Sequence, residues 1–317
     1  MVNYRYQLEE YKGPATRFVC PKCKDHRRTF VQYIDKETGN HVHPLVGRCN
    51  RESKCGYYYP PGEYFKDQNI DEENLFLHNY PTASPEPKAP SFIPNDLMKK
   101  SLSNYNQNNF VSFLIKLFGN QTTSDLLEKY NIGTSNHWPG ATIFWQIDIN
   151  GNIRTGKIML YNPLTGKRVK DENSKIYWMH KAVGKPDFEL QQCLFGEHLL
   201  IGNNKQAAIV ESEKTAIIAS IYFPQYVWLA TGGLSNLTDE KCINLKGRSV
   251  TLFPDLNGFE KWNLKRKELS HKIPGTCFKI SKLLEKNATE KEREDGCDIA
   301  DYLVIFDPKS FGTNRVP

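Results

Sequence analysis

Four cysteines near the start of the chain constrain its folding more than any other feature. They are Cys20, Cys23, Cys49 and Cys55. The first two have the C-x2-C spacing that lets two thiolates on one tight turn bind a single tetrahedral zinc ion, and the other two supply a second pair. The segment between the pairs resembles two strands joined by a Gly39-Asn40 turn. We therefore expect residues 1–65 to form a β zinc ribbon that needs structural zinc to fold.

The second cysteine pair has the looser C-x5-C spacing, which leaves alternatives open. His26, His41 or His43 can replace one thiolate, and four unrelated buried thiols are the alternative to a metal site. Four further cysteines are isolated in the sequence and are expected to be ordinary core residues. They are Cys193, Cys242, Cys277 and Cys297. The N-terminus lacks the apolar segment of a secretory signal, so we expect reduced thiols and a cytoplasmic location.

The chain carries a net charge of +6, and most of the excess lies in its first fifth. Residues 1–65 contain eleven Lys or Arg and seven Asp or Glu, which leaves +4 there. Cations that attract phosphate stand beside tyrosines that can stack on bases, a combination suited to single-stranded nucleic acid. Arg27, Arg28 and Arg51 are candidate contacts; a solvated basic face beside core tyrosines is the alternative. No stretch approaches the ~20 apolar residues that cross a bilayer, so no membrane partner is expected.

The rest of the chain changes pattern twice. Residues 66–104 hold five prolines and are expected to form an extended linker. Residues 105–204 combine two short helices around Gly119 with a β-hairpin at Asn150-Gly151, which predicts a small mixed α+β subdomain. Residues 205–317 alternate short apolar runs with helix-length stretches, which predicts an α/β domain with a mostly parallel sheet. The fold class is therefore a multidomain combination of α+β and α/β parts.

Acidic and glycine residues follow three apolar runs of the last region. Glu211 follows the run that ends at Val210, Gly232-Gly233 follows the next run, and Asp255 follows the third. Ligand sites in open parallel sheets lie at the carboxyl ends of the strands, and paired carboxylates are hard oxygen ligands for Mg²⁺. Taken singly, each acid is more often a helix cap or a solvated residue. Together they predict a magnesium site.

These residues resemble the Toprim family, the catalytic fold of bacterial primases, type IA and II topoisomerases and some nucleases. The sequence VESEKTA looks like the family's VEGEKTA, with Ser212 in place of glycine and Glu211 as the invariant glutamate. The triplet Asp255-Leu256-Asn257 corresponds to the family's Asp-x-Asp, so the resemblance implies Glu211, Asp255 and Asn257 as the catalytic set. Asn257 keeps one oxygen ligand but loses a charge, which weakens the hold on a second metal ion. The late segment DGCDIADYL is similar to an acidic segment of Toprim primases and implies Asp298 and Asp301 as outer-shell or metal-linked acids, with Asp298 as a further magnesium ligand.

The resemblance extends upstream to the order of parts in bacterial primases, which is a zinc ribbon, a linker, a small mixed subdomain and then Toprim. TIFWQIDINGNIRTGKIMLY looks like the primase strands before Toprim, and CLFGEHLL is similar to the segment leading into it. The likeness is closest to short primase-like proteins of plasmids and mobile elements. It implies a DNA primase in DNA replication, with Mg²⁺- or Mn²⁺-dependent nucleotidyl transfer from nucleoside triphosphates on a single-stranded DNA template gripped by the ribbon. A replicative helicase or a relaxase is the implied partner.

The resemblance also assigns basic residues to the nucleic acid. Arg154 and Lys157 match basic residues of the primase core, and Lys167 and Arg168 extend that groove. Each of these four residues can instead be a solvated cation on a strand or turn, with no contact to nucleic acid. Lys214 lies in the helix that follows Glu211. It can either contact a phosphate or be an ordinary surface lysine.

Three other functions stay open. A Toprim nuclease or related phosphoesterase would use the same acids on an existing phosphodiester bond. A non-catalytic accessory protein would bind single-stranded DNA through the ribbon and keep a degenerate Toprim fold, an alternative that Asn257 favours. A protein-docking module would bind no nucleic acid.

Overall fold

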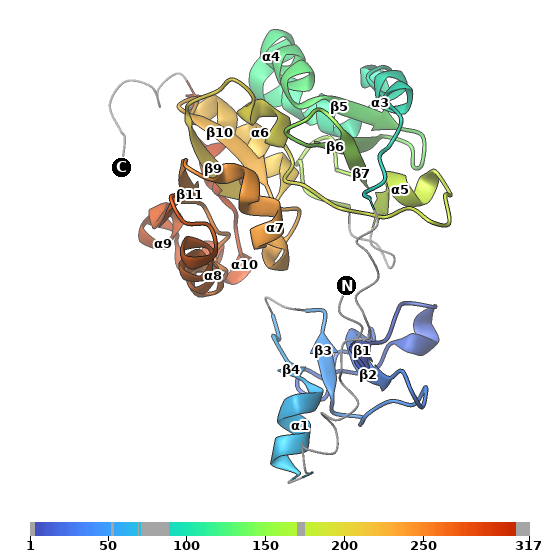
Figure 1. Cartoon of the computed structure of the whole chain (residues 1–317). Helices are drawn as coiled ribbons and strands as arrows, with labels where there is room; N and C mark the ends of the chain where they lie inside the picture. Colours follow the sequence, from blue (N-terminus) through green and yellow to red (C-terminus); the bar gives the residue numbers. More distant parts are fainter. Residues whose placement is uncertain (1–3, 52–53, 69, 71–88, 170–174, 309–317) are drawn as a thin grey trace. The chain divides into compact units, whose positions relative to one another are not determined.

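The computed structural model describes residues 4–51, 54–68, 70, 89–169 and 175–308. The chain divides into two units, Met1–Lys88 and Ala89–Pro317, and each is described by itself (Figure 1). No helix in these described ranges combines the length and the apolar character that crossing a membrane requires.

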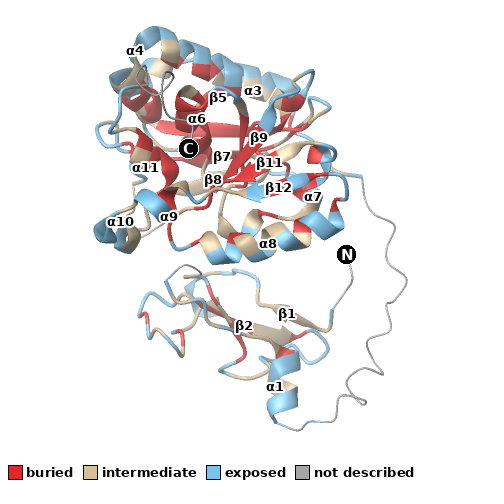
Figure 2. Ribbon diagram, turned by 90° about the vertical axis from the view of Figure 1, so that its left-hand side faces the viewer, coloured by how far each residue is buried: buried red, intermediate tan, exposed pale blue. Residues whose placement is uncertain are grey.

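The first unit is built on a four-stranded antiparallel sheet in the order β1-β2-β3-β4. Its elements are β1 (Tyr6–Leu8), a 3-10 turn (Pro14–Thr16), β2 (Phe30–Asp35), β3 (Gly47–Cys49), β4 (Tyr58–Tyr59) and α1 (Pro61–Asp67). Gly47 is required where β3 pairs with β2, because a Cβ there would collide with the Val31 carbonyl oxygen and the Phe30 ring. Among the described residues, the buried cluster consists of Cys20, Phe30 and Cys49, with Val31 and Val46 buried outside it, and the unit is mostly intermediate or exposed in Figure 2. The ribbon therefore has little apolar core of its own.

The predicted linker, residues 66–104, is not extended at its ends. Helix α1 reaches Asp67, and helix α3 occupies Asn95–Ser101. Pro94 directly precedes α3, where a missing N–H costs nothing because the first amides of a helix have no intrahelical partner. The prediction of an extended conformation was therefore wrong for α3. Three of the five prolines lie outside the described residues, namely Pro81, Pro85 and Pro87.

Helix α4 (Asn109–Tyr130) contains the predicted pair of short helices. Gly119 interrupts it with φ 78° and ψ 173°, so the two halves meet at a kink rather than at a separate loop. Asn108 caps the first half, and its Oδ1 accepts hydrogen bonds from the amides of Phe110 at 3.1 Å and Val111 at 3.3 Å. A 3-10 turn (Tyr105–Gln107) precedes the helix.

An antiparallel sheet in the order β5-β6-β7-β8 follows α4. Its elements are β5 (Ile132–Ser135), β6 (Ala141–Ile147), β7 (Ile153–Met159), β8 (Ile176–Trp178) and the adjoining helix α5 (Met179–Ala182). The tight turn between β6 and β7 contains Gly151 with φ 81°, which confirms the predicted hairpin.

The second sheet of this unit is parallel throughout, in the order β10-β9-β11-β12. Its strands are β9 (Gln206–Val210), β10 (Tyr226–Ala230), β11 (Ser249–Leu252) and β12 (Cys277–Ile280). The first three were predicted from their apolar runs. β12 was missed because it is an edge strand with only Phe278 buried. Cys277 is exposed, so its predicted place in the core was wrong; Cys193 and Cys242 are buried and Cys297 is intermediate.

Short helices connect and cover the parallel sheet. They are α6 (Glu213–Tyr222), α7 (Asp239–Cys242), α8 (Phe259–Lys272), α9 (Leu283–Asn287), α10 (Glu290–Asp295) and α11 (Ile299–Leu303), with 3-10 turns at Glu197–Leu200, Leu234–Asn236 and Ile243–Leu245. Helix α6 packs against β10 and α11, and its buried residues join those of α4 in one core cluster. Figure 2 shows α6 and the strands of the parallel sheet largely in the colour of buried residues. The two predicted regions, 105–204 and 205–317, thus share a hydrophobic core.

Candidate active site and zinc centre

The four cysteine sulfurs of the first unit converge on one point. Cys20 and Cys23 lie on the turn before β2, Cys49 ends β3, and Cys55 lies in the turn before β4. The Sγ atoms of Cys20 and Cys55 are 3.7 Å apart, and those of Cys23 and Cys49 are 4.0 Å apart. A tetrahedral ion with zinc–sulfur distances of about 2.3 Å holds its sulfurs about 3.8 Å apart. The four thiols therefore fit one structural zinc ion.

The histidines offered as alternative zinc ligands lie elsewhere. The four cysteine ligand atoms are all within 4.8 Å of one another, and no histidine of the described residues belongs to the group. His41 Nε2 instead lies 2.9 Å from Glu9 Oε2, and the His43 ring stacks on Tyr64 with the ring centroids 4.8 Å apart. His26 is exposed. The structure therefore brings four cysteines, and none of these histidines, together as ligands for one metal ion.

The thiols differ in how readily they lose a proton. Burial raises the pKa of Cys20 to about 12. Hydrogen bonding from the Asp25 backbone, the largest effect at Cys23, lowers the pKa of that thiol to about 7. Because zinc binds thiolates, loading the site releases these protons and becomes more favourable as the pH rises.

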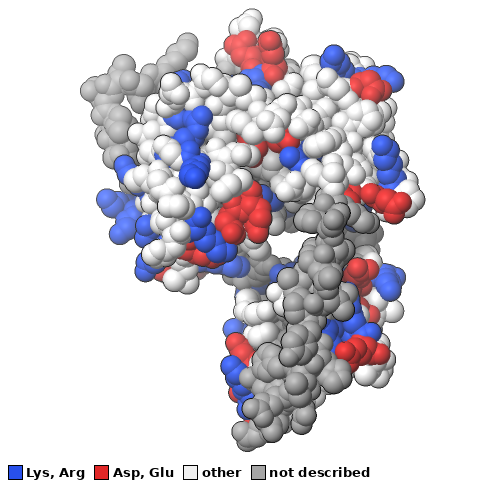
Figure 3. Space-filling view, in the orientation of Figure 1, with Lys and Arg blue, Asp and Glu red and all other residues white. Residues whose placement is uncertain are grey.

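Two of the arginines predicted to contact nucleic acid hold a carboxylate of the ribbon. Arg27 Nη2 lies 2.8 Å and Arg51 Nη1 2.5 Å from Asp25 Oδ2. Hydrogen bonds from Arg27 hold the pKa of Asp25 well below its usual range. Arg28 is exposed, with φ 53°. On the face of each unit that Figure 3 presents, basic and acidic side chains of the described residues are interspersed rather than gathered in one basic band.

Glu211 and Asp255 stand at the ends of two neighbouring parallel strands of the second unit. β9 ends at Val210, directly before Glu211, and β11 ends three residues before Asp255. The turn after Asp255 packs on Glu211, since a Cβ on Gly258 would lie 3.1 Å from Glu211 Oε1. The sheet thus brings the two acids to one edge.

Asp255 is in an unfavourable environment for a negative charge. Its Oδ1 is buried and accepts no hydrogen bond from the described residues. Burial raises the pKa of Asp255 well above its usual value, and the negative charges of Glu211 and Asp298 raise it further. A cation would coordinate the buried oxygen and offset the repulsion. The pair fits Mg²⁺, which commonly takes one or two protein carboxylates and keeps several water ligands.

A cavity of about 410 Å³ opens beside these acids. Its size falls in the range of small-molecule sites, about 300–1,000 Å³. The acids that line it are Glu211, Glu213, Asp255, Asp295, Asp298 and Asp301. The cations that line it are Lys157, Lys167, Arg168 and Lys214. The loop after β10 contributes Gly232 and Gly233 to the lining, which also includes Met159, Tyr161, Gly166, Ser212, Gly296 and Cys297.

Lys157 and Glu213 form a buried ion pair in the cavity wall. Lys157 Nζ donates to Glu213 Oε2 and to the Gly232 carbonyl oxygen, each at 3.1 Å. The two side chains are 7% and 1% exposed, and Glu213 Oε1 has no partner among the described residues. The predicted template contact Lys157 thus links β7 to α6 and to the glycine loop. Sequence reasoning missed Glu213, whose signal was its place two residues after Glu211 at a helix start, where an acid is ordinarily a cap.

Lys214 is not a solvated surface lysine. It pairs with two acids of the segment DGCDIADYL, Asp298 and Asp301. Its Nζ lies 3.3 Å from Asp301 Oδ1 and 3.6 Å from Asp298 Oδ2. Burial lowers the pKa of Lys214, but the negative charges of Asp298 and Asp301 outweigh burial and raise it above its usual value. Asp298 is the N-cap residue of α11.

Two of the site residues predicted in the second unit do not line the cavity. Arg154 donates from Nε to Asp148 Oδ2 at 2.6 Å and from Nη1 to Gln191 Oε1 at 2.8 Å. Asn257 is exposed, and its Nδ2 donates to the Arg293 carbonyl oxygen at 2.6 Å. Lys167 and Arg168, by contrast, are exposed residues of the cavity lining.

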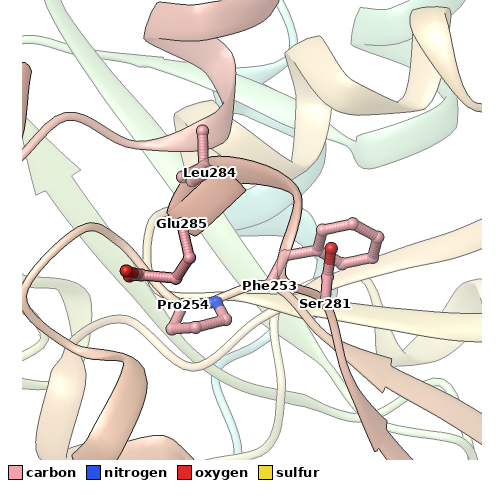
Figure 4. Close-up of a pocket in the computed structure, with 5 residues that line it drawn as sticks. All are labelled: Phe253, Pro254, Ser281, Leu284 and Glu285. Carbon is pink, nitrogen blue, oxygen red and sulfur yellow. The ribbon is translucent and has the colours of Figure 1, made fainter. Parts of the chain in front are cut away.

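A second cavity lies next to the end of β11 and is too small for a ligand. Figure 4 shows its lining, which is Phe253, Pro254, Ser281, Leu284 and Glu285. Its volume is about 10 Å³, which is close to the space of a single water molecule. The Glu285 carboxylate points away from the Phe253 ring in Figure 4 and pairs with Arg293 at 3.0 Å.

Two family models match parts of the chain. The zinc beta-ribbon finger family matches residues 4–70, and a domain of unknown function, DUF6371, matches residues 108–256. No curated protein sequence matches the chain.

The chain is similar to solved structures of bacterial and phage primases. The primase fragment of the bacteriophage T7 primase-helicase protein is 15% identical, with a TM-score of 0.37 over 88% of this chain and 98% of its own. The zinc-binding and RNA polymerase domains of Aquifex aeolicus primase are 13% identical, with a TM-score of 0.40 over 96% of this chain and 78% of theirs. The RNA polymerase domain of Mycobacterium tuberculosis primase DnaG is 10% identical, with a TM-score of 0.43 over 68% of this chain and 79% of its own.

Proposed function

We propose that the second unit carries a Toprim-type site for magnesium-dependent nucleotidyl transfer and synthesises primers on single-stranded DNA. The observation that carries the proposal is the pairing of Glu211 and Asp255 at adjacent strand ends, with a buried Asp255 oxygen that no donor of the described residues satisfies. Paired acids at this edge of a parallel sheet, beside a polar cavity with cations in its lining, suit a phosphate-bearing substrate. The likeness of VESEKTA and Asp255-Leu256-Asn257 to Toprim motifs supports the same chemistry.

Each lining group has a distinct role in this proposal. Asp255 would hold the ion, and Glu211 would act as a second metal ligand or as the general base that accepts a proton from the attacking hydroxyl. Bound Mg²⁺ or Mn²⁺ would neutralise charge that develops on phosphate oxygens. Lys167 and Arg168, which are exposed, contact the phosphates of the nucleotide or template. Lys157 positions the glycine loop through its bond to the Gly232 carbonyl oxygen.

The first unit is proposed to grip the template. Bound zinc would hold the ribbon strands together, and the exposed Arg28 would contact a phosphate of the template. Such binding weakens as salt rises, because phosphate contacts release condensed counterions. A replicative helicase or a relaxase is the partner class that the resemblance suggests.

Primer synthesis by the full-length, zinc-loaded protein tests the proposal. Labelled nucleoside triphosphates, a single-stranded template and Mg²⁺ or Mn²⁺ are expected to yield short oligomers. Glu211→Gln and Asp255→Asn are each expected to lower the rate at least about a hundredfold, the scale of losing one electrostatic stabiliser of a transition state. Glu240→Gln, at an exposed acid of α7, is the matched control and should retain the wild-type rate.

The other outcomes separate the competing functions. Shortened strands in place of new oligomers would identify a nuclease that uses the same acids. Wild-type synthesis in both acid variants would refute the residue assignment.

A non-catalytic, single-stranded-DNA-binding role is the second candidate. The observation that favours it is Asn257, whose amide is turned to the Arg293 carbonyl oxygen and whose side chain carries no charge. Salt-dependent binding of single-stranded DNA without oligomers or cleavage, with either metal, would establish this role instead.

A further inference from the structure

Lys214 places a positive charge within the acidic part of the cavity. It lies in the first turn of α6, and its side chain is 13% exposed. Its Nζ reaches Asp301 Oδ1 at 3.3 Å and Asp298 Oδ2 at 3.6 Å, at the start of α11. An ammonium group therefore already lies between two carboxylates that could otherwise bind a metal ion.

Asp298 is bound by the chain through both carboxylate oxygens. Oδ1 accepts a hydrogen bond from the Asp301 amide at 2.9 Å, and Oδ2 accepts one from the Thr215 hydroxyl at 2.7 Å. Asp255 differs, since its Oδ1 is buried and accepts no hydrogen bond from the described residues. Asp298 is thus satisfied by groups of the chain itself, including the Lys214 ammonium, whereas the buried oxygen of Asp255 is one that a bound cation would satisfy.

The charges of the lining agree with a single ion. Among the described residues, six acids and four cations line the cavity, so the charges of these ten side chains sum to −2 when every group is ionised. One divalent cation balances them. A second divalent ion at Asp298 would lie close to the Lys214 ammonium, and like charges a few ångströms apart repel strongly where water is partly excluded.

We propose that Lys214 is the resident cation of this cavity and occupies the place of a second metal ion, so that the protein binds one divalent cation, at Glu211 and Asp255. The inference rests on the proposed function for the identity of the site, but the number of bound ions is measurable without activity. Asn257 agrees with it, because the acid expected to strengthen a second metal position is absent there. Asp298 is reassigned from magnesium ligand to partner of Lys214.

Counting Mn²⁺ ions on the full-length, zinc-loaded protein tests this inference. Free aqueous Mn²⁺ is followed by electron paramagnetic resonance during a titration without nucleotide or DNA, and zinc keeps the ribbon thiols occupied. The wild type is expected to bind one Mn²⁺. Lys214→Met, which keeps the length but removes the charge, is expected to bind two. Lys267→Met, at an exposed lysine of α8, is the matched control and should bind one.

Two results would overturn the inference directly: two Mn²⁺ ions on the wild type, or one on a folded Lys214→Met protein. Asp298→Asn provides a second test that does not depend on that variant folding. It should still bind one Mn²⁺, whereas Asp255→Asn should bind none. Loss of the Mn²⁺ ion in Asp298→Asn would show that Asp298 is a metal ligand and would refute the role of Lys214.

The same titration separates the inference from the proposed function. One Mn²⁺ ion on a protein that synthesises no primers would support the inference and refute the proposed function. Two Mn²⁺ ions on a protein that does synthesise primers would refute the inference and support the proposed function.

Discussion

Arg154 is a basic side chain whose contacts give it a structural role. Its guanidinium bonds Asp148, whose side chain is 2% exposed, across the β6–β7 hairpin. We predict that Arg154→Ala lowers the free energy of unfolding by about 2–4 kcal/mol, because removing one partner leaves a buried carboxylate without its main counter-charge. Urea unfolding at pH 7 measures this loss. Arg154→Lys, which keeps the charge but not the two-pronged geometry, should lose less.

The pH dependence of this loss follows from Asp148. Burial acts to raise the pKa of Asp148, but hydrogen bonds from Asn152 and Arg154 outweigh it and hold the pKa below its usual value. A depressed carboxyl pKa contributes stability above the unfolded value of about 3.9, and that stability is lost as the pH falls through the folded pKa. The deficit of Arg154→Ala should therefore be full at pH 7 and shrink below about pH 4. A deficit that does not change with pH would contradict this account.

Single residues show where prediction from sequence stops. The cysteine cluster could be predicted because its spacing is local and its chemistry is specific. The partners of the basic residues could not, since Lys157 reaches Glu213, 56 positions away, and that contact exists only once the two sheets are packed. Asn257 could be aligned with a motif, but its left-handed backbone, φ 72°, and its bond to Arg293 turn the amide elsewhere.

Glu197 joins three elements through one carboxylate oxygen. Its Oε1 accepts hydrogen bonds from the Ile149 amide in the β6–β7 turn at 3.0 Å and from Asn244 Nδ2 at 2.9 Å. Burial raises the pKa of Glu197 above its usual value. A raised carboxyl pKa means that the folded state holds its proton longer, so stability falls as the pH rises above about 4.3, the unfolded value, through the folded one.

We therefore predict that Glu197→Gln does not lower stability at pH 7. Glutamine keeps an oxygen for both donors and removes the buried charge, so the variant should gain on the wild type between pH 4 and pH 7. Thermal unfolding across that pH range measures the difference. Glu197→Ala is the control that leaves both donors unpaired, and it should cost about 1–3 kcal/mol or more at every pH. A Gln variant that tracks the Ala variant would show that the charge itself is required.

Elements were predictable where side-chain periodicity is strong. The β6–β7 hairpin and strands β9, β10 and β11 follow from alternation and from buried apolar runs. β12 has one buried side chain and α3 none, so neither presents a periodic signal. Strand order is decided by packing across the sheet, which no local pattern encodes.

At the scale of the molecule, the two units differ in what stabilises them. The second unit has large apolar clusters that join α4, α6 and the parallel sheet. The first has a buried cluster of three residues, and two of these are zinc ligands. The cysteine spacing predicted that a metal ion stabilises the first unit, and the later apolar runs predicted that a hydrophobic core stabilises the second. The shared core of residues 105–204 and 205–317 could not, because its contacts join segments distant in sequence.

We predict that removing zinc unfolds the first unit and leaves the second folded. Without the ion, the small ribbon core cannot offset the conformational entropy of the chain, whereas the second unit keeps its apolar core. Hydrogen exchange followed by mass spectrometry should show amides of β2 and β3 losing protection after chelation while β9 and β11 keep theirs. Cys20→Ser should reproduce the effect and lower the zinc content below one ion per chain, and Cys297→Ser is the matched control. Protected ribbon strands in the zinc-free protein would mean that the apolar contacts of Phe30 suffice to fold this unit.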